Sequence, residues 1–98
     1  MNDTITPERL EKYFLLTGEA LEKAKKALNP QKKKEAVDAL DMAQRYHDDA
    51  KYFLAEKNDA VLAFAALNYA HGWLDAGARL ELFLVTDSRL FTVDDNTP

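Results

Sequence analysis

Three long stretches of this chain repeat their apolar residues at intervals of three and four positions, and two short breaks separate them. This spacing gathers the apolar side chains on one face of an α-helix. Each break ends one helix and begins the next, because the proline of Asn29-Pro30 disfavours a helical residue before it and Asn58-Asp59 supplies an N-cap. The pattern predicts three helices, at about residues 7–28, 31–57 and 60–85.

Both breaks are too short for a parallel crossover, so consecutive helices must run antiparallel. The expected fold class is all-α, a three-helix up-and-down antiparallel bundle, and 98 residues provide one domain with one core. A short C-terminal tail of residues 86–98 follows the bundle. Its apolar side chains Leu90, Phe91 and Val93 leave two alternatives, a docked tail or a partly disordered one.

The second and third helices can be aligned so that large residues meet small ones at every level. This register sets Leu40 against Gly77 and Ala50 against Leu67. A glycine inside a helix costs roughly 1 kcal/mol relative to alanine, so Gly77 requires a compensating contact. We expect that contact to be the side chain of Leu40.

Composition narrows the classes of function. The chain has no cysteine, which excludes disulfides and thiolate metal sites, and it has no apolar run long enough for a membrane span and no recognisable signal peptide. Six lysines gather between residues 22 and 35, but neither arginine nor aromatic residues accompany them, so nucleic acid is not the expected partner. The prediction is a cytoplasmic protein without a cofactor or a metal ion.

The predicted third helix is apolar over more of its circumference than two neighbouring helices require. Either the first helix and the tail cover this surplus, or it contacts another molecule. Large aromatic side chains supply much of the binding energy at protein interfaces. Our leading hypothesis is a small helical interaction module that forms a homo-oligomer or binds a protein partner through Tyr69, Trp73, Leu80 and Phe83.

A polar stripe on the same helix supports a competing hypothesis. Asn68, His71, Asp75 and Arg79 recur at steps of three and four, so they share one face. They could form a site for a small ligand or a nucleotide, catalytic only with a partner protein. The stripe contains no nucleophile, so enzymatic activity is not the expected function; the alternative interpretation is a solvated helix face.

His47 lies within the apolar stripe of the predicted second helix. We expect a core histidine that is hydrogen-bonded to Tyr13, to Thr17 or to a main-chain carbonyl. Two histidines at no recognisable spacing do not make a metal site.

The segment from Ala50 to Phe83 resembles the archaeal domain-of-unknown-function family 357, most clearly in the run NYAHGWLDAGARLELF. KYFLLTGEALEKA in the first helix and RLFTV near the C-terminus fit the same family. The resemblance implies a spectrin-like three-helix up-and-down bundle and no assigned activity.

A looser likeness is to helical domains of the HEPN type. Their ribonuclease signature is an arginine followed by a histidine at a wider spacing than Arg45 and His47 have here, and no histidine follows Arg79. RNA cleavage is therefore not expected.

Overall fold

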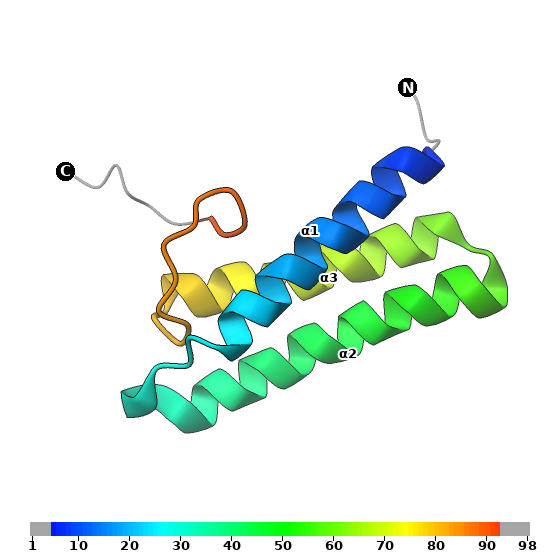
Figure 1. The fold of residues 1–98 in the computed structure, drawn as a ribbon. Coiled ribbons are helices and arrows are strands. Elements are labelled where there is room, and N and C mark those ends of the chain that lie inside the picture. The colour runs from blue at the N-terminus through cyan, green and yellow to red at the C-terminus, as the bar shows by residue number, and fades with distance from the viewer. Residues whose placement is uncertain (1–4, 93–98) are drawn as a thin grey trace.

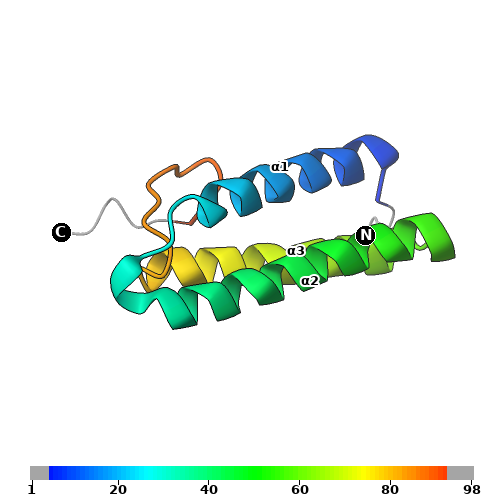
Figure 2. The ribbon, with the colours of Figure 1, turned by 60° about the horizontal axis from the view of Figure 1, so that its bottom comes forward.

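The computed structural model describes residues 5–92 and shows three antiparallel helices, which confirms the predicted fold class (Figure 1). Helix α1 spans Pro7–Lys25, α2 spans Lys33–Lys57 and α3 spans Ala60–Arg79, with a single 3-10 turn, η1, at Pro30–Lys32. The helices α2 and α3 form a hairpin, and α1 lies across it (Figure 2). All three helices contact one another.

The helix starts follow from local chemistry. The Thr6 side chain accepts a hydrogen bond from the backbone N–H of Arg9 at 3.2 Å, and Asp59 accepts one from Leu62 at 2.9 Å. Each bond satisfies a backbone donor that the first turn leaves unpaired. At the end of α2, Asn58 adopts the left-handed conformation with φ of 49°, which asparagine tolerates well.

Helix α3 ends at Arg79, so the prediction that it continues to residue 85 is wrong. Glu81 takes a left-handed φ of 60°, and the N–H of Leu82 bonds the carbonyl of Gly77 at 2.8 Å. This is the Schellman arrangement that commonly closes a helix. Glycine usually occupies this left-handed position, but here the residue is Glu81. The sequence therefore carries no glycine that would predict the end of the helix.

The reversal after α3 brings Phe83 back onto the helix. The Phe83 side chain is 1% exposed, and a Cβ built on Gly77 would lie only 2.2 Å from its ring carbon Cε2. The side chain nearest to Gly77 is therefore Phe83, and not Leu40 as expected. Phe83 also pairs with Leu28 in an isolated antiparallel bridge.

The core contains two clusters of buried side chains, one at each end of the bundle. The first includes the residues that follow α3, and its buried members are Ala20, Leu21, Ala24, Ala36, Ala39, Ala43, Leu74, Phe83, Leu90 and Phe91. The second lies at the opposite end and comprises Leu10, Ala50, Ala63, Ala66 and Leu67. Alanine dominates both clusters, which lets the helices of the hairpin approach closely.

The segment after α3 docks on the bundle as far as it is described. Leu90 and Phe91 are each 1% exposed, and Asp87 and Arg89 form ion pairs with Lys23 and Glu19 of α1. Residues 87–91 of the predicted tail thus lie against the bundle. Val93 and the residues beyond it lie outside the described part of the chain.

Candidate binding surface on helix α3

The outward face of α3 carries large apolar side chains in water. Tyr69 is 63% exposed, Trp73 39% and Leu80 60%, and Leu62 extends the same row toward the start of the helix. We call these four residues the ridge. Phe83 was predicted to belong to this surface, and that placement is wrong because the turn at residues 80–82 buries its side chain in the core.

A row of small residues runs beside the ridge. Ala65, Gly72 and Ala76 follow one another at helical spacing, and beyond its own turn of helix a Cβ built on Gly72 would meet none of residues 5–92 within 4 Å. We call these three residues the furrow. A hollow of about 310 Å³ opens here, lined by Asn68, Tyr69, Gly72, Trp73 and Ala76.

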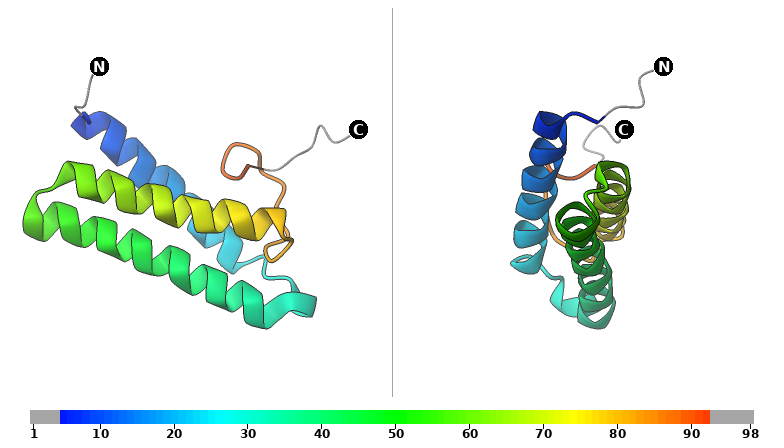
Figure 3. Two further views of the ribbon diagram at one scale, coloured as in Figure 1. Left: turned by 180° about the vertical axis from the view of Figure 1, so that it is seen from behind. Right: turned by 90° about the vertical axis from the view of Figure 1, so that its right-hand side faces the viewer.

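One aromatic side chain of the ridge is held in place by α2. The rings of Tyr46 and Tyr69 stack with centroids 5.3 Å apart and an interplanar angle of 25°. A supported ring loses less rotational freedom on binding than a free one, which lowers the cost of using it in a contact. Figure 3 shows the two helices of the hairpin running side by side along their length.

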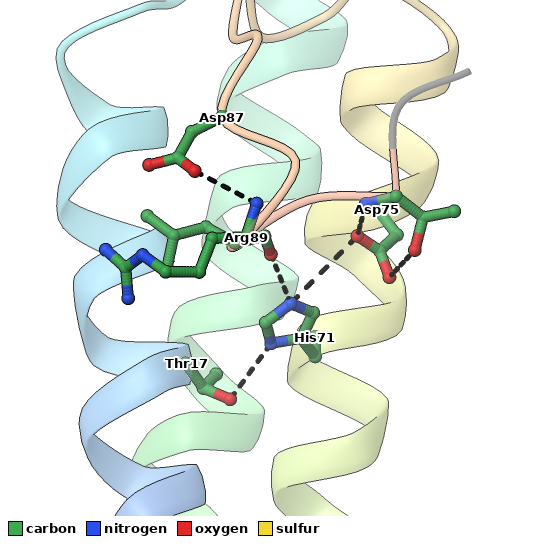
Figure 4. A network of polar contacts seen from close by, with 7 residues as sticks. Thr17, His71, Asp75, Asp87 and Arg89 are labelled. Atoms are coloured by element: carbon green, nitrogen blue, oxygen red, sulfur yellow. Dashed lines mark hydrogen bonds and ion pairs between the residues drawn. The ribbon is translucent and has the colours of Figure 1, made fainter. Parts of the chain in front are cut away.

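The polar stripe next to the furrow is used by the C-terminal segment (Figure 4). The Nδ1 atom of His71 lies 3.0 Å from the Thr17 hydroxyl, and its Nε2 atom lies 2.5 Å from the Leu90 carbonyl. A carbonyl oxygen can only accept, so Nε2 carries the proton and donates. In the neutral ring Nδ1 then accepts the Thr17 hydroxyl proton, so His71 joins α1, α3 and the tail.

Asp75 completes this attachment one turn further along α3. Its two carboxylate oxygens accept hydrogen bonds from the Thr92 backbone N–H at 2.7 Å and from the Thr92 hydroxyl at 3.2 Å. The nearest contact between the Asp75 carboxylate and His71 Nε2 is 4.0 Å. We call His71, Asp75 and their partners Thr17, Leu90 and Thr92 the latch.

The predicted site residues therefore separate into two groups. Asn68, His71 and Asp75 line one hollow of about 280 Å³ together with Gly72 and three residues of α1, Tyr13, Leu16 and Thr17. Arg79 lies beyond this hollow at the end of α3 and does not line it. Sequence reasoning missed Thr17, Leu90 and Thr92, and the apolar pair Leu90-Phe91 was the one signal that this segment docks.

His47 is buried at 7% exposure, and within the described residues its expected hydrogen bond to Tyr13, to Thr17 or to a main-chain carbonyl does not reach normal geometry. The burial that lowers its pKa is opposed by a weak interaction with the Phe14 backbone. Neither ring nitrogen has a hydrogen-bond partner within the described residues. The ring packs edge-on against Phe14, and its Nε2 faces the open side of Gly18. Burial, reinforced by repulsion from Lys51, lowers the pKa of His47 below its ordinary value of 6.5 because the charged ring would lose its water.

Two findings concern metal ions and membranes, and both apply to residues 5–92. No group of three or more His, Cys, Asp or Glu side chains there is arranged to hold a metal ion. None of the helices combines the length and the apolar character needed to cross a bilayer.

The fold and its surface define a class: a small three-helix bundle that leaves one apolar helix face uncovered by its described residues. Within that class the chain belongs to the DUF357 family, described as a protein of unknown function, whose family model matches residues 12–83. Searches of curated proteins and of solved structures gave no match. The family expected from the run at residues 68–83 is confirmed.

Proposed function

We propose that this domain is a small interaction module that pairs with a second copy of itself through the ridge and furrow of α3. The observation that carries the proposal is the large exposed fraction of Tyr69 and Leu80 beside the empty space over Gly72. Contiguous apolar surface of this kind on a small protein is typical of an interaction site.

The shape of the surface favours a second copy as the partner. A two-fold axis parallel to α3 would place the ridge of one copy over the furrow of the other, and the same contact would occur twice. Trp73 would then enter the hollow over Gly72, which a side chain at that position would fill. Tyr69 would lie against the small side chain of Ala65.

Charge does not oppose this pairing. Between residues 60 and 78 Asp75 is the only acidic or basic residue apart from His71, and the latch directs it toward Thr92. A two-fold contact places identical residues near the axis, so like charges there would repel. The surface avoids that cost as far as residue 78, and its nearest charges are Arg79 and Glu81 beside Leu80.

The alternative of a small-ligand site rests on the hollow around Asn68, His71 and Asp75. Both nitrogens of His71 and both carboxylate oxygens of Asp75 already have partners in the latch. A ligand would have to compete with the docked tail for these atoms. The geometry therefore supports the interface more strongly than a ligand or a nucleotide site.

Sedimentation equilibrium over a range of protein concentrations tests the proposal. We expect a monomer–dimer equilibrium in the micromolar range, weakened at least tenfold by Trp73→Ala, because central aromatic anchors typically contribute 2 kcal/mol or more. Tyr52→Ala is the matched control, since Tyr52 is an aromatic residue of α2 that is 50% exposed and lies outside the ridge.

Gly72→Leu separates loss of the interface from loss of the fold. Apart from its own turn of helix, a Cβ at Gly72 meets no atom of the described residues within 4 Å, so the variant should fold and yet be monomeric. A wild-type protein that remains monomeric at every concentration would refute the proposal, as would a dimer that Gly72→Leu leaves intact.

A further inference from the structure

A third and larger hollow lies at the far end of the bundle from the turn after α3. It occupies about 640 Å³ between the first turns of α1 and the last turns of α2. Its lining residues, apart from two charged ones, are Ile5, Pro7, Leu10, Phe14, Leu15, Leu54, Ala55, Asn58 and Ala60. The volume is within the range of about 300–1,000 Å³ that small-molecule sites occupy.

The hollow follows from the way α1 crosses the hairpin. Figures 1 and 3 show α1 close to α2 where α1 ends and farther from it where α1 begins. The side chains that a closer approach would cover remain in water: Leu15 is 68% exposed and Leu54 36%. An apolar ligand in this space would bury both.

Two charged residues line the hollow from opposite sides. Glu11 belongs to α1 and Lys51 to α2. Neither forms an ion pair or a hydrogen bond with another residue of the described part of the chain, so both remain available to a ligand. A ligand with only a negative charge would be attracted by Lys51 and repelled by Glu11. A ligand with only a positive charge would be attracted by Glu11 and repelled by Lys51.

We propose that the hollow between α1 and α2 binds a zwitterionic amphiphile, with its aliphatic chain against Leu54 and its head group between Glu11 and Lys51. The anionic group of the ligand would accept from the Lys51 ammonium, and its cationic group would donate to the Glu11 carboxylate. The site is independent of the α3 surface, because none of the ridge or furrow residues lines it.

Three probes with the same aliphatic chain and different head groups test the charge assignment. They are 2-aminodecanoate, decanoate and decylammonium, titrated below their micellar concentrations by calorimetry. We expect 2-aminodecanoate to bind most tightly, by about threefold to fivefold over the other two, since exposed charge pairs contribute up to about 1 kcal/mol each. Equal affinity for all three probes would overturn the proposal, and so would absence of binding.

Variants of the two charged residues sharpen the test. Lys51→Met should abolish the preference over decylammonium, and Glu11→Gln should abolish the preference over decanoate. Lys57→Met is the control, because Lys57 also lies at the end of α2 but does not line the hollow. A preference that both site variants leave unchanged would overturn the head-group assignment.

Occupancy of this hollow is distinguished from adsorption elsewhere by two further observations. Ala55→Phe should block binding, and Ala55 is exposed, so the larger side chain should not disturb the fold. On binding, the NMR signals of the Leu54 methyl groups should shift while those of exposed Val37, at the other end of α2, should not. Binding that survives Ala55→Phe, or that shifts Val37 equally, would place the probe elsewhere and overturn the proposal.

Discussion

Helix α3 contains two glycines five positions apart that meet opposite surroundings. At Gly77 the space that a Cβ would need is taken by the ring of Phe83, 2.2 Å away, whereas at Gly72 the same space is empty. Each glycine costs the isolated helix about 1 kcal/mol. The first cost is offset inside the molecule by a packed aromatic ring, and nothing in the described monomer offsets the second.

A glycine within a helix can therefore indicate close packing inside the molecule or a surface open to another molecule. The sequence alone does not distinguish these two cases. Gly77 lies at the closed end of α3, where the chain turns back over the helix. Gly72 lies on the open side, between the ridge and the latch. The two positions should therefore respond differently to an added methyl group.

The largest effect is expected at Gly77. Gly77→Ala should lower the free energy of unfolding by about 3 kcal/mol, because the added methyl group forces the Phe83 ring out of its place in the core. Urea denaturation measures this change, with Gly72→Ala as the matched control. An unchanged midpoint would mean that Phe83 does not pack on Gly77.

The latch should contribute less than the packed ring. Asp75→Ala removes both hydrogen bonds to Thr92 and should cost about 1–2 kcal/mol. Amide hydrogen exchange should then accelerate at Leu90 and Phe91 more than in the hairpin. Asp41→Ala, which removes an exposed pair with Arg45 on α2, should change stability by less than about 0.5 kcal/mol. Equal effects of the two variants would show that the tail is not held by Asp75.

His47 should make stability depend on pH. Its pKa is lowered by burial, so below about pH 6.5 the unfolded chain binds a proton that the folded chain does not yet accept. Stability is therefore complete above this pH and falls as the solution is acidified, by at most about 1.4 kcal/mol per pH unit for one proton. In His47→Phe this contribution should disappear, and His71 is present in both proteins, so its own contribution cancels. Parallel pH curves would contradict the burial of His47.

The smallest expected effects are increases in the free energy of unfolding. Gly72→Ala and Gly18→Ala should each stabilise the monomer by about 0.5–1 kcal/mol, since alanine is the better helix former and the new methyl groups meet open space or His47 Nε2 at 3.6 Å. Thermal denaturation is the measurement. A loss of stability in Gly72→Ala would show that the furrow is filled within the monomer and would remove the contrast with Gly77.

Much of the fold could be predicted from the sequence because helix starts and apolar periodicity are local signals. Thr6-Pro7 and Asp59 begin their helices as expected. The end of α3 could not be predicted, since the periodicity continues through Leu80 and Phe83 and the left-handed residue is Glu81. The helix ends in the left-handed turn at Glu81, and the packing of Phe83 on Gly77 that accompanies this turn is a tertiary contact with no local signal.

The candidate surfaces were predictable to different degrees. Tyr69 and Trp73 could be assigned to an apolar face because helical spacing alone groups them. The latch required tertiary information, since Thr17, His71 and Leu90 come from three segments that are distant in the sequence. The helical spacing predicted the polar stripe on α3, but it could not predict that Thr17, Leu90 and Thr92 bind to it.

The latch also constrains the order in which this chain can fold during its synthesis. Thr17 and His71 are 54 positions apart, and the ion pair of Glu19 and Arg89 spans 70. Contacts at such separations form late, because the chain between them must first be ordered. The α2–α3 hairpin can close before these contacts exist, while the C-terminal half of α1 gains its hydrogen bonds and ion pairs to residues 87–90 only after that segment has been synthesised. A chain that lacks residues 87–92 would therefore leave Ala20, Leu21 and Ala24 of α1 without the cover of Leu90 and Phe91, and chaperones could bind this apolar side of the helix.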